Sequence, residues 1–84
     1  MDKQIKQDIK KIMLKVYGLD ITIEDIENVS TCEGTEYQTI IDNYYYTFYI
    51  TEEKDNINYA YCVFDSLTNE DSELRYITKK IRAQ

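Results

Sequence analysis

The hydrophobic pattern of this chain changes its period once, and that change sets the fold class. Residues 2–17 repeat apolar side chains at the i, i+4, i+7 and i+8 spacing of one α-helical face. Gly18 follows directly, and glycine can take the left-handed conformation that ends a helix. Thr22 and Asp25 resemble an N-cap pair, which predicts one helical turn near 23–28, with a strand as the alternative.

After this point, short runs rich in Val, Ile, Thr, Tyr and Phe predict β-strands. The runs are Val29–Glu33, Glu36–Asp42, Tyr44–Thr51 and Ile57–Asp65. The hairpin-compatible segments between them are Gly34-Thr35, Asp42-Asn43 and Glu52–Asn56. Strands joined by short turns pair antiparallel, so we expect a meander of three to four strands.

The segment after Asp65 has the pattern of a C-terminal helix, with Thr68 or Asn69 as its cap. Acidic residues fill its first turn and basic residues its last, which is the charge order that a helix dipole favours. Its apolar face is Leu74, Ile77 and Ile81. We expect both helices to pack on one sheet face, giving an α+β fold in a single domain over residues 1–84.

Alternation along the strands predicts which tyrosines are exposed. In Tyr44–Thr51, one face carries Tyr44, Tyr46, Phe48 and Ile50, and the other carries Tyr45, Thr47, Tyr49 and Thr51. We expect the second set on the uncovered face. In Ile57–Asp65 the pattern leaves open which side chains face the helices.

Charge is distributed unevenly along the chain, although its net value is only −6. Residues 1–19 carry five lysines against two aspartates, and residues 74–84 carry four basic residues and no acid. Residues 20–73 hold fourteen of the sixteen acids against Lys54 alone. Such a segment attracts cationic partners and opposes contact with nucleic acid. We expect a basic protein partner, no direct nucleic-acid or membrane contact, and terminal lysines that balance the acidic sheet.

The composition excludes most catalytic chemistry. The chain has no His, so Ser30, Ser66 and Ser72 lack an imidazole base, and neither cysteine lies in a Cys-x-x-Cys motif. The acid-rich windows Glu52–Asn58 and Asp65–Glu73 lack the glycine of a calcium loop. We expect no enzyme activity, no cofactor and no metal.

Cys32 and Cys62 are expected to be reduced and buried, because nothing in the sequence indicates a secreted context. No run of about twenty apolar residues occurs, and the Lys-rich N-terminal stretch lacks the apolar core of a signal peptide. We therefore expect a cytoplasmic protein.

Acids and tyrosines together form the predicted partner-binding site. Carboxylates along loops and strand ends can stand in for phosphates, so that Arg and Lys side chains that normally grip DNA bind them instead. Tyrosine, present nine times, offers a large contact area at low entropy cost and stacks on arginine. The predicted partner-binding residues are Glu52, Glu53, Asp55, Asp65, Glu70, Asp71, Tyr45 and Tyr49.

A small, acidic, His-free chain rich in Tyr and carboxylates, with the order helix, meander, helix, resembles the small phage-encoded inhibitors of bacterial defence, notably anti-CRISPR proteins that mimic DNA. The resemblance implies a non-enzymatic inhibitor in the cytoplasm of the host bacterial cell. Its partner would be a basic nucleic-acid-binding protein such as a CRISPR effector. Two alternatives stay open: a homodimerising accessory domain that buries the Tyr-rich sheet face, and an antitoxin-like regulator.

Overall fold

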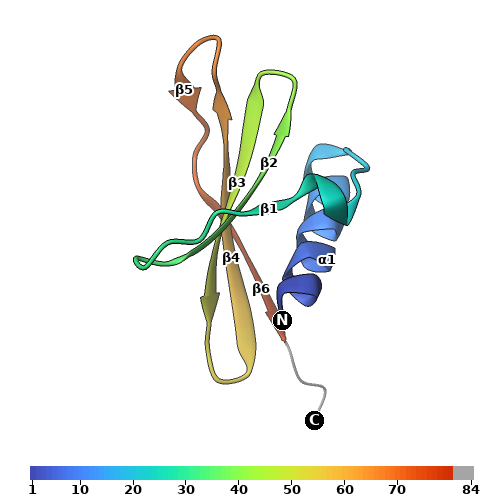
Figure 1. Ribbon diagram of the computed structural model, residues 1–84, viewed down its shortest axis with the longest axis vertical. Helices are drawn as coiled ribbons and strands as arrows, with labels where there is room; N and C mark the ends of the chain where they lie inside the picture. The colour runs from blue at the N-terminus through green and yellow to red at the C-terminus, as the bar shows by residue number, and fades with distance from the viewer. Residues whose placement is uncertain (81–84) are drawn as a thin grey trace.

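The computed structural model describes residues 1–80, which form one helix and an antiparallel sheet (Figure 1). Helix α1 spans Asp2–Ile12 and continues as a π-helical turn over Met13–Tyr17. Gly18 ends it with φ +68°, in the left-handed region that glycine adopts without strain. The predicted helix over 2–17 and its glycine end are confirmed. No helix of the described residues is long and apolar enough to cross a membrane.

A 3₁₀ turn over Ile23–Asp25 connects the helix to the sheet. The Asp25 carboxylate accepts hydrogen bonds from the backbone N–H and from the hydroxyl of Thr22, each at 3.0 Å. The short strand β1, Glu27–Asn28, follows. The segment near 23–28 therefore contains both of the predicted alternatives, a single turn and a strand.

The predicted strand over Val29–Glu33 is wrong, because these residues form the loop between β1 and β2. The side chain of Asn28 accepts a hydrogen bond from the Ser30 N–H at 3.0 Å, and that of Thr31 accepts one from the Glu33 N–H at 3.1 Å. Such local bonds turn the backbone and compete with strand pairing.

The sheet is antiparallel throughout, and its first four strands lie in chain order. After β1 its strands are β2 (Thr35–Ile41), β3 (Tyr44–Glu52), β4 (Asn56–Asp65), β5 (Glu70–Asp71) and β6 (Arg75–Lys80). β5 and β6 pair with successive parts of the same edge of β4. The β2–β3 hairpin turns at Asp42-Asn43 as predicted, with Asp42 at φ +55°. The α+β class is confirmed, with more strands than expected.

The predicted C-terminal helix is wrong, because β5 and β6 occupy its place. β4 would otherwise leave a row of unpaired backbone groups along one edge, and β6 satisfies them from Asn56 to Tyr61. Tyr76, Ile77 and Thr78 are strand-forming residues that suit this edge. Among residues 1–80, α1 is therefore the one α-helix that covers the sheet. Of the predicted helical face, Leu74 is exposed and Ile81 lies outside the described residues.

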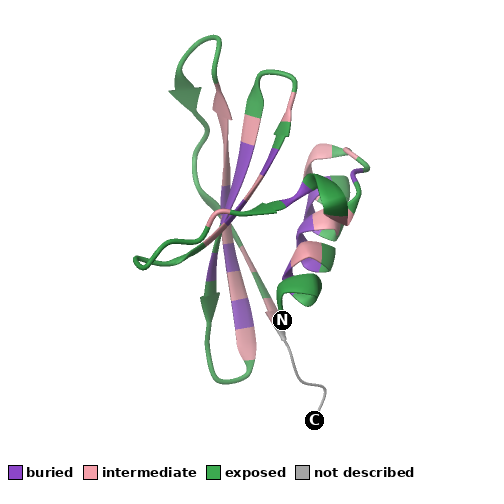
Figure 2. Ribbon diagram, viewed as in Figure 1, coloured by how far each residue is buried: buried purple, intermediate pink, exposed green. Residues whose placement is uncertain are grey.

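The hydrophobic core lies between α1 and one face of the sheet, and buried residues alternate along the strands that form it (Figure 2). In β3, Tyr46, Phe48 and Ile50 point into the core, as predicted. In β4 the sequence left open which set of alternating side chains faces the helix, and the structure shows which set is buried. The buried core residues of β4 are Ile57, Tyr59 and Tyr61.

One carboxylate is built into this core. Asp8 of α1 is only 2% exposed, and it accepts hydrogen bonds from Tyr59 Oη at 2.6 Å, Lys79 Nζ at 2.7 Å and Gln4 Nε2 at 3.0 Å. Burial, followed by the bond to Asp8, raises the pKa of Tyr59 above its usual range. A buried charge is tolerated when it is fully paired. This cluster therefore ties α1 to β4 and β6.

Candidate partner-binding surface

The face of the sheet opposite α1 is not covered by any helix of the described residues (Figure 1). We call it the open face. Strand alternation and register place the following residues on it: Glu27, Glu36, Gln38, Ile40, Tyr45, Thr47, Tyr49, Thr51, Asn56, Asn58, Ala60, Cys62, Phe64, Asp71, Tyr76, Thr78 and Lys80. Polar, aromatic and aliphatic groups are mixed on this face, whereas the other face is largely apolar.

Large apolar side chains on the open face are exposed to solvent. Ile40 is 50% exposed, Tyr49 42% and Tyr76 71%. Tyr45 is half-buried, because its ring packs edge-on against Phe64 with centroids 6.0 Å apart. The sequence thus placed Tyr45 and Tyr49 on the correct face. It missed Tyr76, because the predicted C-terminal helix hid the alternation of β6.

Thr47 is a correction to the predicted exposed set. It lies in the middle of the open face, paired in register with Gln38 and Cys62, and it is buried. Tyr45 and Tyr49 follow on either side of it along β3. Larger neighbours therefore cover a small side chain at the centre of the sheet.

The open face is negatively charged. Glu27, Glu36 and Asp71 lie on it, and within residues 1–80 the one basic residue at a register position of this face is Lys80, opposite Asn56 at the end of β6. Burial raises the pKa of the Cys62 thiol, and the carboxylates of Asp71 and Glu36 raise it further. The same two carboxylates add to the effect of burial and of Cys62 in raising the pKa of Tyr49. Both acids therefore act electrostatically on the centre of this face.

The six predicted acids lie at two opposite ends of the sheet, so the expected continuous patch is wrong. Glu52, Glu53 and Asp55 surround the β3–β4 turn, and Asp65, Glu70 and Asp71 belong to the β4–β5 hairpin. The ten residues of β4 separate the two groups by about 30 Å at a rise of roughly 3.3 Å per residue. Since charges are screened over about 8 Å, the groups act independently.

Only one of the six predicted acids joins the exposed tyrosines on the open face. Asp71 pairs in register with Phe64, which places it there. Asp65 Oδ1 accepts hydrogen bonds from the backbone N–H groups of Leu67 and Thr68, at 2.9 and 3.4 Å, so it shapes the β4–β5 turn. The others lie elsewhere: Glu52 and Glu70 on the α1 side of the sheet, Glu53 and Asp55 in the β3–β4 turn.

The lysine side chains that the structure describes in the terminal segments form no ion pair with these six acids. The ion pairs join Lys10 to Asp20 at 2.8 Å, Lys79 to Asp8 at 2.7 Å and Lys6 to Asp2 at 3.7 Å. The expectation that the terminal lysines balance the acidic sheet is therefore wrong for the described part of the chain. The negative charge of these six carboxylates is therefore not offset by a described lysine side chain, and it acts on the surrounding solvent.

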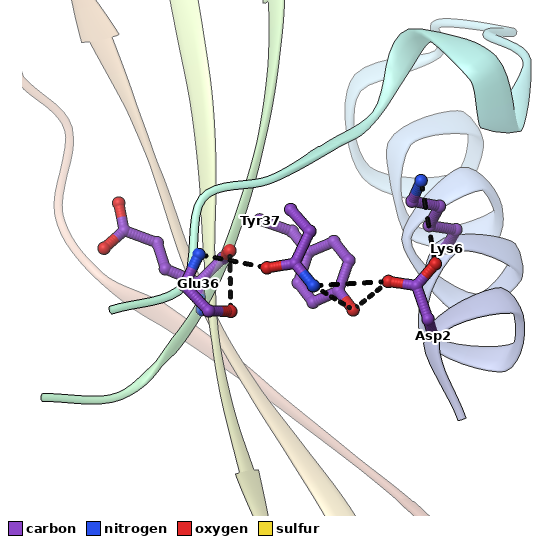
Figure 3. Close-up of polar contacts among 6 residues, drawn as sticks. Asp2, Lys6, Glu36 and Tyr37 are labelled. Carbon is purple, nitrogen blue, oxygen red and sulfur yellow. Dashed lines mark hydrogen bonds and ion pairs between the residues drawn. The ribbon is translucent and has the colours of Figure 1, made fainter. Parts of the chain in front are cut away.

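A second polar cluster holds the start of α1 to the sheet (Figure 3). The Tyr37 hydroxyl donates to the Asp2 carboxylate, and Asn28 Nδ2 donates to the Tyr37 oxygen at 3.2 Å. Burial and this bond raise the pKa of Tyr37 to about 12, and the bond from Tyr37 lowers the pKa of Asp2. Lys6 completes the cluster beside Asp2. Its polar groups bind one another, so the cluster supports the fold.

The cysteines, the possible metal ligands and the groove beside α1 give no second candidate site in the described part of the chain. Cys32 and Cys62 are free, but the prediction that both are buried is wrong, because Cys32 is exposed in the loop before β2 and Cys62 is half-buried. Within residues 1–80 no three Cys, Asp or Glu side chains are grouped to hold a metal ion. A groove of about 670 Å³ runs between α1 and the 3₁₀ turn, and its Lys10 is occupied by Asp20 and by the Ile21 carbonyl oxygen.

Comparisons with protein-family models, with curated proteins and with solved structures gave no match. Interpretation of function therefore depends on the geometry and charge of the open face.

Proposed function

We propose that this protein is a non-enzymatic binding protein whose open face attaches to a basic protein surface. By occupying a surface that otherwise contacts nucleic acid, it inhibits a nucleic-acid-binding protein. The observation that carries the proposal is the combination of exposed tyrosines with the carboxylates of Glu27, Glu36 and Asp71 on the same sheet face.

Exposed aromatic groups favour an interaction surface over a purely solvated face. Tyr49 and Tyr76 expose large rings from regular strands, and Ile40 adds an aliphatic group. Tyrosine is enriched among the residues that dominate binding energy at protein interfaces. Because the rings are held on strands, they lose little conformational freedom on binding.

Charge selects the class of partner. Glu27, Glu36 and Asp71 favour a cationic surface, speed its approach and weaken the complex as salt increases. The surfaces of nucleic-acid-binding proteins have this cationic character, because they neutralise phosphates. In this proposal the open face, together with the adjacent β4–β5 hairpin, occupies the cationic surface to which the nucleic acid would otherwise bind. The acids of the β3–β4 turn lie too far away to belong to the same contact.

A homodimer through the open face is the second candidate, favoured by the exposed rings alone. In a twofold interface each copy presents the same patch, so the carboxylates of Glu36 and Asp71 from both copies would enter one contact. Like charges across an interface oppose association. A basic partner removes this repulsion, which is why we place it first. An antitoxin-like regulator differs only in the identity of that partner.

The proposal is tested by capture at low salt, with the immobilised protein and a bacterial lysate. We expect a basic protein that is retained by the wild type, released by duplex DNA and lost with Glu36→Lys. Glu24→Lys changes the net charge equally on the opposite side of the sheet, so it should retain the partner. A captured protein that DNA does not release, or that both variants lose, contradicts the proposal. Light scattering of the purified protein distinguishes the homodimer.

A further inference from the structure

Four residues form one row across the open face. Glu36 of β2 pairs in register with Tyr49 of β3, Tyr49 with Ala60 of β4, and Ala60 with Tyr76 of β6. Register partners in a sheet project from the same face, so their side chains lie side by side. The row therefore places a small residue between two exposed aromatic residues, with a carboxylate at one end.

The spacing of this row leaves a slot between the two rings. Neighbouring strands lie about 4.8 Å apart, so the backbones of Tyr49 and Tyr76 are separated by about 10 Å across β4. The methyl group of Ala60 is the only side chain between them in the row. Two carbon contacts of about 3.5 Å each require about 7 Å between facing rings. A planar group can therefore enter between Tyr49 and Tyr76 above Ala60.

The rings are not already stacked within the chain. The aromatic pairs of the described residues involve other rings, including Tyr45 with Phe64 and Phe48 with Tyr61. Neither Tyr49 nor Tyr76 therefore uses its ring in an aromatic pair, and the two side chains are 42% and 71% exposed. The neighbouring polar groups are occupied, since the Thr78 hydroxyl donates to the Asn58 Oδ1 at 2.7 Å.

We propose that this row is an arginine-binding slot, in which a guanidinium group of the partner lies between Tyr49 and Tyr76 above Ala60, and the carboxylate of Glu36 on the far side of Tyr49 adds electrostatic attraction. The inference rests on the proposed function, because it names the chemical group through which the basic partner is recognised. Guanidinium is planar and stacks on aromatic rings. A lysine ammonium group is not planar and cannot stack between two rings in this way, so the slot discriminates between the two cations.

The test uses oligo-arginine and oligo-lysine peptides of equal length, titrated into the full chain at low salt by calorimetry. We expect the arginine peptide to bind several-fold more tightly than the lysine peptide. Ala60→Ile fills the slot and suits a strand, and it should weaken the arginine peptide by about tenfold while leaving the lysine peptide unchanged. Tyr76→Ala should have the same selective effect.

Tyr44→Ala is the matched control. Tyr44 is 41% exposed, nearly the same as Tyr49, but it lies on the α1 side of the sheet. It should not change the preference for arginine. Thermal unfolding of each variant verifies that the fold is retained, and Ala60→Ile is the variant expected to keep it best.

The outcomes separate the slot from the function on which it rests. Equal binding of both peptides, or an arginine preference that survives Ala60→Ile, overturns the slot while the basic-partner proposal stands. If neither peptide binds at low salt, both proposals fail.

Discussion

The two faces of the sheet contain the same kind of residue in different surroundings. On the face under α1, the Tyr37 and Tyr59 hydroxyls donate to Asp2 and Asp8 of the helix, and both side chains are buried. On the open face, the rings of Tyr49 and Tyr76 are exposed. The comparison teaches that the number of tyrosines says little about function. A tyrosine supports the fold when its hydroxyl is hydrogen-bonded within the chain and its ring is buried. It is available for binding when its ring is exposed.

Two adjacent residues of β3 give the largest expected difference in unfolding free energy between the two faces. Phe48 is fully buried, and Tyr49 is 42% exposed on the other side of the same strand. Phe48→Ala should lower the free energy of unfolding by about 3–5 kcal/mol, because it leaves a cavity in the core. Tyr49→Ala should lower it by less than about 1 kcal/mol. Urea unfolding of both variants measures the difference, and equal losses would remove the distinction between the faces.

The carboxylates of the two faces should also differ. Asp8→Asn removes the charge that Tyr59 and Lys79 contact inside the core, so we expect a loss of about 2–3 kcal/mol in unfolding free energy. Glu36→Gln on the open face should change it by less than about 0.5 kcal/mol. Chemical denaturation at neutral pH compares the two. A stability of Asp8→Asn equal to that of Glu36→Gln would show that the buried cluster does not hold α1 to the sheet.

Alkaline pH tests the Tyr37–Asp2 contact of the covered face, when wild type is compared with a variant that lacks only the Tyr37 hydroxyl. Tyrosine in the unfolded chain loses its proton near pH 10, whereas Tyr37 in the folded chain keeps it to about pH 12. Between these values the unfolded state binds fewer protons, so stability falls as pH rises, and it is unaffected by this group below pH 10. Tyr37→Phe should flatten this part of the stability profile. A slope unchanged by the substitution would contradict the assignment.

Ala60→Ile, on the open face, should leave the stability of the protein nearly unchanged. A β-branched residue suits a strand, so thermal unfolding should shift upward slightly or remain unchanged, within about 1 kcal/mol. The open face offers the space above Ala60, since its row neighbours Tyr49 and Tyr76 are exposed. A large destabilisation would mean that this position is packed, and the open face would then resemble the covered one.

Local signals in the sequence were sufficient for the elements that depend on neighbours along the chain. The helical period with Gly18 predicted α1, the Asp42-Asn43 pair predicted the β2–β3 hairpin, and alternation assigned Tyr45 and Tyr49 to the correct face. These features are determined within a few residues, so sequence reasoning reaches them.

The errors come from contacts between distant segments. Arg75–Lys80 has a charge order typical of a helix end, but the unpaired edge of β4 draws it into the sheet. In the sequence Asp8 is one of two aspartates among the N-terminal lysines, and nothing near it indicates burial; Lys79, seventy-one residues later, is one of the groups that compensate its burial. The separation of the two acidic ends was accessible in principle, because the length of the predicted strand Ile57–Asp65 already sets it.

Amide chemical-shift mapping of the arginine-peptide titration tests the central claim most directly, because it reports every strand at once. We predict that the shifts concentrate at Glu36, Tyr49, Ala60 and Tyr76 on the open face, while the core residues under α1 stay unchanged. Shifts confined to the β3–β4 turn, or spread evenly over both faces, would contradict the account.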